Sequence, residues 1–146
     1  MTSTTTKKIT NQKGQGMVEL ALALPLFLAF LFGTIEIGRA WYFSAHLLNS
    51  VRAAARYGAV LSDTSDIKAG IDTYLRKEIG KYMPPEKITG TNVEIIGPDG
   101  PRVEGVNHGD TIIVSVEYNF TVLSGSIVPA LNGDIRLNKT ASMNYE

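Results

Sequence analysis

Few residues of this 146-residue chain have types and spacings that could do chemistry. Its two histidines, His46 and His108, are far apart in sequence and have no acidic cluster beside them, so no metal site is expected. Ser124-Gly-Ser126 lacks the strand–turn–helix setting of a nucleophile elbow, and Gly97-Pro-Asp-Gly100 lacks the Gly-Lys-Ser/Thr ending of a phosphate loop. The sequence therefore predicts a protein that is not an enzyme and needs no cofactor or small-molecule substrate.

The charge balance and the absence of cysteine exclude further kinds of partner and site. The 14 Lys and Arg residues balance the 14 Asp and Glu residues, so no overall field attracts nucleic acid, and none is expected as a partner. Cysteine is absent, which excludes disulfides and thiolate metal sites. Any folded domain must therefore be held together by packing alone.

One acid, Glu19, directly precedes a run without charge. Residues 20–35 contain no Asp, Glu, Lys or Arg. An acid at the centre of a membrane helix costs about 2.5–3.5 kcal/mol, and less near the interface. A simpler interpretation makes Glu19 a favourable negative charge on a helix N-terminus at the headgroup level.

The segment Met17–Ile37 is long enough to cross a bilayer, which needs about 20 mostly apolar residues. A cleaved signal peptide would have an apolar region of about 7–15 residues and a small-x-small site, which Arg39-Ala-Trp does not offer. Pro25 is expected to kink the helix. Basic residues precede the span, and Glu36 can pair with Arg39 after it, which favours a cytoplasmic N-terminus.

Beyond the span, the sequence predicts two helical regions. Helical character continues to Ala59 as a stalk with one apolar stripe, whereas a polar side holds Asn49, Arg52 and Arg56. A second, amphipathic helix is expected from Asp66 to about Tyr82, with Ser62–Ser65 offering caps. The stalk stripe contains Leu47, Val51, Ala54 and Gly58, and the second contains Ile67, Ile71, Leu75 and Ile79.

The rest of the chain predicts β-structure. Residues 92–96 form a short strand, and residues 110–122 and 134–145 alternate between apolar and polar positions. Three strands in series suggest a small antiparallel meander, whose apolar face is covered by the stalk or by the second helix. The expected fold class is therefore α+β. Its parts are a basic leader (1–14), a transmembrane helix with stalk (15–60) and an extracytoplasmic α+β domain (61–146).

The N-terminal segment resembles a known family. A basic leader ends in Gly14, and Glu19 then becomes the fifth residue of a chain that starts at Gln15, which is similar to the prepilin signal of type IV pilins and pseudopilins. More specifically, two motifs resemble those of TadE-like proteins. The first is Val-Glu-x-Ala-x-x-x-Pro, which ends at Pro25, and the second is Gly-x-x-Glu-x-Gly-Arg, which ends at Arg39. These are minor pilins or pseudopilins of tight-adherence (Flp-type) pilus systems.

The resemblance implies a function and a set of partners. A prepilin peptidase would cut between Gly14 and Gln15, and Glu19 would pair with the new amine of a neighbouring subunit. Pro25 would let the helix bend as it leaves the membrane. The partners implied are the membrane, that peptidase, other pilins or pseudopilins and the pilus assembly platform.

The same resemblance implies a place in the cell and leaves alternatives. The chain would span the bacterial inner membrane once, with its domain outside, and would enter the fibre or prime its assembly. An uncleaved bitopic scaffold subunit of an envelope secretion complex is the alternative. A membrane-tethered hydrolase is a third interpretation, disfavoured by the missing catalytic residues.

Overall fold

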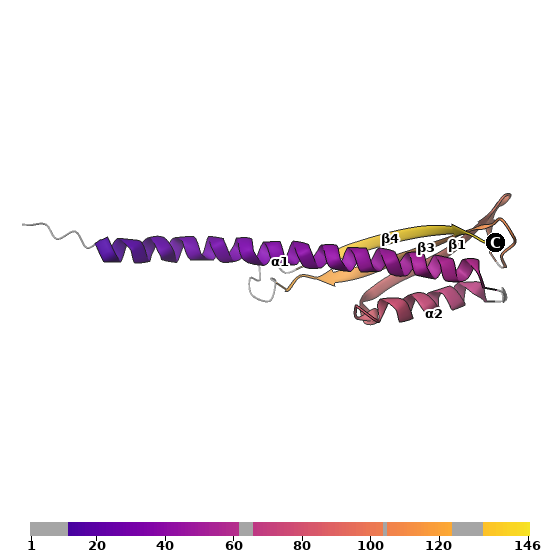
Figure 1. Cartoon of the computed structure of the whole chain (residues 1–146), viewed down its shortest axis with the longest axis horizontal. Helices are drawn as coiled ribbons and strands as arrows, with labels where there is room; N and C mark the ends of the chain where they lie inside the picture. The colour runs from indigo at the N-terminus through magenta and orange to yellow at the C-terminus, as the bar shows by residue number, and fades with distance from the viewer. Residues whose placement is uncertain (1–11, 62–65, 104, 124–132) are drawn as a thin grey trace, which may run out of the picture. The chain divides into compact units, whose positions relative to one another are not determined.

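The computed structural model describes residues 12–61, 66–103, 105–123 and 133–146. They fall into two compact units, divided between Ile35 and Glu36, and helix α1 (Gln12–Ala59) contributes to both (Figure 1). Three sequence features lie outside the described residues: most of the basic leader, the predicted caps at Ser62–Ser65, and Ser124-Gly-Ser126.

The described part of the first unit is the N-terminal half of α1. The helix begins at Gln12, five residues before the start predicted at Met17. Extending an existing helix adds one hydrogen bond per residue, and Gly14 and Gly16 oppose this by only about 1 kcal/mol each. Every side chain from residue 14 to residue 31 is exposed, although most of them are apolar. An exposed apolar helix of this length fits a single-pass membrane protein.

The second unit combines the outer half of α1 with α2 (Ile67–Ile79), the short 3₁₀ helix η1 (Pro85–Lys87) and a four-stranded sheet. The strands are β1 (Ile88–Gly97), β2 (Gly100–Arg102), β3 (Thr111–Thr121) and β4 (Asp134–Asn144). Their order is β2-β1-β3-β4, and all neighbours are antiparallel. The fold class is therefore α+β, as predicted.

Strand β3 lies inside the sheet and follows the predicted alternation. Its core-facing side chains are at most 2% exposed: Ile112, Val114, Val116, Tyr118 and Phe120. Because it pairs with β1 on one side and β4 on the other, its backbone donors and acceptors are used on both edges. This strand therefore forms the centre of the hydrophobic core.

Both helices cover that core, where the sequence left the choice between them open. The predicted stalk stripe, from Leu47 to Gly58, is buried, and so is the predicted stripe of α2. The polar side of the stalk is exposed at Asn49, Arg52 and Arg56. Helix α2 ends at Ile79, three residues earlier than predicted, because the N–H groups of Lys81 and Tyr82 donate to carbonyls only three residues back and the chain then turns toward Pro84.

The sequence did not predict β2. A tight turn at Pro98 and Asp99 folds the chain back onto β1, and Gly100 takes a φ of +124° that favours glycine. Strand β2 has three residues and contains Pro101, so no alternation is visible, and proline is tolerated there because β2 is an edge strand. The result is a hairpin at one edge of the predicted meander.

A buried ion pair closes the same end of the sheet. Asp110 is 0% exposed, its Oδ2 lies 2.6 Å from Nε of Arg102 in β2, and it accepts a 2.8 Å hydrogen bond from the backbone N–H of Asn107. The Asn107 hydrogen bond, assisted by Arg102, lowers the pKa of Asp110 below its usual value, although burial alone would raise it. The carboxylate thus holds the loop before β3 against β2.

This pair predicts a pH-dependent stability. The pKa of Asp110 is lower in the folded protein than in the unfolded chain, where it is about 3.9. The carboxylate therefore stabilises the fold above about pH 3.9, and this stabilisation is lost as pH falls through the pKa of the folded protein. We expect Asp110→Asn to lower Tm at pH 7 and to reduce the loss of Tm between pH 7 and pH 3. The matched control is Asp72→Asn, which removes an exposed pair with Arg76 worth about 0.3–0.5 kcal/mol. Equal pH profiles for the wild type and Asp110→Asn would contradict the assignment.

The two helices approach each other at Gly58. A Cβ there would lie 2.9 Å from Cγ1 of Ile71 in α2 and closer still to its Cδ1. We expect Gly58→Val to destabilise the second unit by about 1–3 kcal/mol through overpacking. Gly38→Val is the matched control, because it places the same residue in the same helix with no atom within 4 Å. Thermal unfolding in detergent measures the difference, and equal Tm values would refute the predicted clash.

Candidate assembly surface

The predicted processing residues lie in the first two turns of α1. Gly14 and Gln15 are helical and exposed, and a Cβ built on Gly14 or Gly16 would meet no atom within 4 Å. The peptide bond between Gly14 and Gln15 is therefore near a helix end, where turns open most readily. Neither glycine is required by packing against a described residue.

Glu19 is the single charged side chain between residues 14 and 35. It is exposed, it forms no ion pair with another described residue, and exposed Val18 and Leu20 flank it. Gln15 and Glu19 are four residues apart, so they share one face of α1. An acid in this apolar setting gains most from a cation supplied by another molecule.

Pro25 lies inside α1, and the helix continues through it without a break. Proline has no N–H, so the carbonyl of Ala21 loses its usual partner in the helix. This turn is therefore held by fewer backbone hydrogen bonds than its neighbours. The expected kink at Pro25 stays a prediction.

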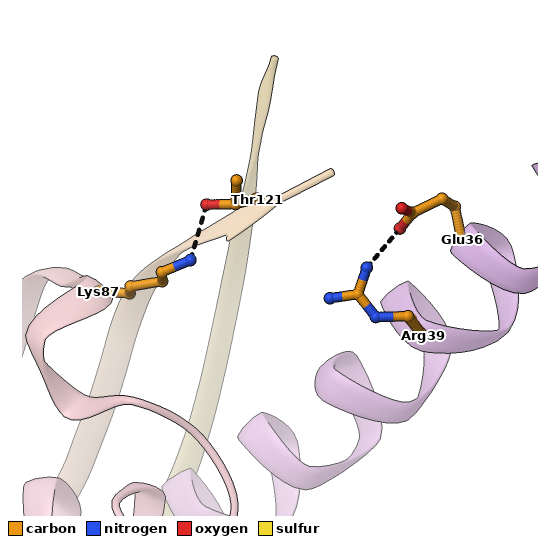
Figure 2. Close-up of polar contacts among 4 residues, drawn as sticks. All are labelled: Glu36, Arg39, Lys87 and Thr121. Atoms are coloured by element: carbon orange, nitrogen blue, oxygen red, sulfur yellow. Dashed lines mark hydrogen bonds and ion pairs between the residues drawn. The ribbon is translucent and has the colours of Figure 1, made fainter. Parts of the chain in front are cut away.

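The Glu36–Arg39 pair stands at the start of the second unit. Nη1 of Arg39 lies 2.7 Å from Oε2 of Glu36, one turn apart on α1 (Figure 2). Cζ of Arg39 also lies 5.1 Å from the ring centre of Phe120, near the end of β3. The guanidinium therefore connects α1 both to its own preceding turn and to the sheet.

A second polar contact fastens the same end of the sheet. Nζ of Lys87, in η1, donates a 2.8 Å hydrogen bond to Oγ1 of Thr121, the last residue of β3 (Figure 2). Both contacts involve residues at the C-terminal end of β3, because Arg39 packs on Phe120 and Lys87 binds the next residue. The C-terminal end of β3 therefore contacts both α1, through Arg39, and η1, through Lys87.

The structure brings together some of the predicted site residues. Glu36 and Arg39 form a pair in the second unit, whereas Gly14, Gln15, Glu19 and Pro25 share the helix of the first unit. Phe43 and Phe120, which were not predicted as site residues, have rings 5.3 Å apart beside Arg39. No spacing in the sequence links them, because 77 positions separate the two in the chain.

The two histidines stay in separate elements. His46 is half-buried on α1, with its ring centre 4.3 Å from that of Tyr42 and 4.5 Å from that of Tyr82. His108 is exposed in the loop before β3. Over the described ranges, no three His, Asp or Glu side chains converge as metal ligands.

Comparison with known proteins identifies one relationship. The family model described as TadE-like protein matches residues 14–56, which confirms the resemblance found in the sequence. The matched range covers the described exposed half of α1 and most of the half that packs in the second unit. No curated protein and no solved structure matches the chain.

Proposed function

Because residues 14–56 match the TadE-like family model, we propose that this chain is a minor pilin or pseudopilin of a tight-adherence pilus. It is made as a precursor with a basic leader (1–14), and a prepilin peptidase cuts between Gly14 and Gln15. Residues 15–60 then anchor the subunit, and residues 61–146 complete its extracytoplasmic domain. The observation that carries the proposal is an exposed apolar helix with one acid, Glu19, five residues into the processed chain.

In this proposal, Glu19 selects the neighbouring subunit. Cleavage creates an amine at Gln15, and the amine of one subunit neutralises the Glu19 carboxylate of the next at the edge of the lipid. Pairing offsets the cost of placing either charge in an apolar setting and fixes the axial register of the helices. Ala21, Ala23 and Ala29 are exposed small residues that permit close packing of those helices.

The rest of the chain faces the outside in this proposal. The N-terminus is cytoplasmic, because basic residues flank that side of the span, while Glu36 offsets Arg39 on the other side. The folded second unit is then available to other pilins and to the assembly platform. In this position the protein initiates or assembles the pilus that attaches the cell to a surface.

Deletion of the gene in the native bacterium tests the function. We expect the deletion strain to lose tight-adherence pili in sheared fractions, and the intact chain to restore them. The alternative, an uncleaved scaffold of a secretion complex, predicts a chain that starts at Met1 or Thr2 and co-purifies with an inner-membrane complex. Normal pili in the deletion strain would refute the proposal.

A further inference from the structure

An open groove of about 550 Å³ lies within the second unit, between α1 and the edge strand β4. Ile37, Trp41 and Leu48 line it from α1, and Leu137 and Lys139 line it from β4. Except at Lys139, its walls are apolar or small. No catalytic or processing residue discussed above contributes to it.

The helices leave the core-facing side of β4 partly uncovered, in the groove and toward both ends of the strand. On the core-facing side of β4, Ile135 stands opposite Phe120 and Met143 opposite Ile112. Their partners on β3 are buried, yet Ile135 is 48% exposed and Met143 is 36% exposed. Trp41, on the facing side of the groove, is 77% exposed. This is an apolar sheet face that continues past the protein's own core.

Lys139 gives the groove its chemical preference. It lies at the middle of β4 and stands opposite the buried Val116, so its stem is on the core-facing side. It is half-buried, and its ammonium has no ion pair or hydrogen bond with any described residue. A cation in an apolar wall favours an occupant that brings a carboxylate.

We propose that this groove binds an α-helix of a different protein, with an apolar face that carries one Asp or Glu opposite Lys139. The α1 wall runs from Ile37 to Leu48, about 17 Å, or three turns of a partner helix. Ala40, Ser44 and Ala45 lie along this wall, and their small side chains let a second helix approach closely. Trp41 supplies the large exposed contact typical of a binding hot spot.

A second copy of the chain does not supply this helix. Between Ile37 and Ala59, α1 contains no acid, and the apolar stripe of α2 is already buried. Glu19 lies 18 residues before Ile37, about 27 Å along α1, so in a copy that spans the same membrane it lies on the other side of the bilayer from the groove. Antiparallel pairing of two β4 strands about their midpoint would place Lys139 against Lys139, and like charges directly opposite are destabilising. The groove therefore selects a heterologous partner and disfavours self-association.

Lipid does not account for the whole groove either. Leu48 lies 12 residues after Glu36 on α1, about 18 Å further along the helix. The polar layer on each side of a bilayer is only about 5–8 Å thick. Contact with headgroups explains an exposed Ile37 or Trp41 but does not reach the wall formed by Ala45 and Leu48.

Trp41 is the only tryptophan, so its emission reports directly on the groove. The experiment titrates the full chain, in lipid nanodiscs, with a tryptophan-free Ala/Leu helical peptide of about 18 residues. The peptide is made in three versions, with Glu, Gln or Lys at its central apolar-face position. We expect a saturable blue shift with the Glu peptide and at least about tenfold weaker binding of the Gln and Lys peptides.

Variants of the chain complete the test. Lys139→Glu should reverse the order of peptide affinities, so that the Lys peptide binds most tightly. Lys139→Gln should make the affinities of the three peptides equal. Lys87→Glu is the matched control, because it changes a lysine that binds Thr121 away from the groove and should keep the wild-type order. Equal binding of all three peptides overturns the proposal. So does a stable self-dimer that Lys139→Glu does not change. The test does not depend on cleavage at Gly14 or on the proposed pilus function.

Discussion

Gly14→Val should leave the chain at its full length in cells that contain the prepilin peptidase, whereas the wild-type chain should start at Gln15. A β-branched side chain at the last residue before the cut crowds the peptide bond that the peptidase must grip. In the structure a Cβ at Gly14 meets no atom within 4 Å, so the substitution does not disturb the described fold. Intact mass and N-terminal sequence of the membrane-extracted protein measure the outcome, and processing is expected to fall from complete to undetectable.

Gly16→Val is the matched control for this experiment. Gly16 lies two residues later on the same helix, and a Cβ there also meets nothing within 4 Å. Both variants lose a glycine and gain a valine in the same turns of α1, so the cost to helix formation is the same. Cleavage of Gly16→Val but not of Gly14→Val locates the cut. A wild-type chain that starts at Met1 or Thr2 with and without the peptidase would reject prepilin processing.

Glu19→Ala should reduce assembly of the protein into or onto the pilus by on the order of 100-fold, the equivalent of about 3 kcal/mol. The substitution leaves the amine of a neighbouring Gln15 without its counter-charge in an apolar setting. Because Glu19 contacts no cation among the described residues of its own chain, the loss should not come from unfolding. Immunoblots of sheared pili and of whole membranes, compared at equal expression, measure the ratio.

Leu20→Ala controls for the loss of side-chain volume next to Glu19. Leu20 is 64% exposed on the same helix, so its truncation removes apolar contact area without removing charge. We expect it to assemble far better than Glu19→Ala. Glu19→Asp keeps the negative charge and should retain part of the assembly into or onto the pilus. Unchanged processing together with unchanged assembly in Glu19→Ala would exclude the charge-pairing mechanism.

Local patterns determined much of the fold. The period of β3 and the stripe of α2 each appear in consecutive residues, and both proved to be core-facing. These patterns are visible in the sequence because one face of each element must be buried. Apolar residues therefore recur at every second position in a strand and at every third or fourth position in a helix. The N-terminal segment was equally readable, and its resemblance was confirmed by the family match.

Non-local contacts could not be read in the same way. Strand β2 forms because a turn brings three residues onto β1, and Arg102 then meets Asp110 eight positions later. Phe43 lies two residues after Trp41 in the sequence, but Trp41 is exposed whereas Phe43 packs against Tyr118 and Phe120 of the core. In each case the deciding partner lies in another element, so local propensity carried no signal.

The sequence by itself determined that the chain has one apolar helix with a single acid, an α+β domain and a match to TadE-like proteins. The tertiary structure decided which surfaces that domain leaves free. Only the sheet order places β4 at an edge, and only the packing of both helices over β1 and β3 leaves Trp41 and Lys139 on an uncovered groove. The physical reason is that exposure is a property of neighbours in space, which a one-dimensional pattern does not contain.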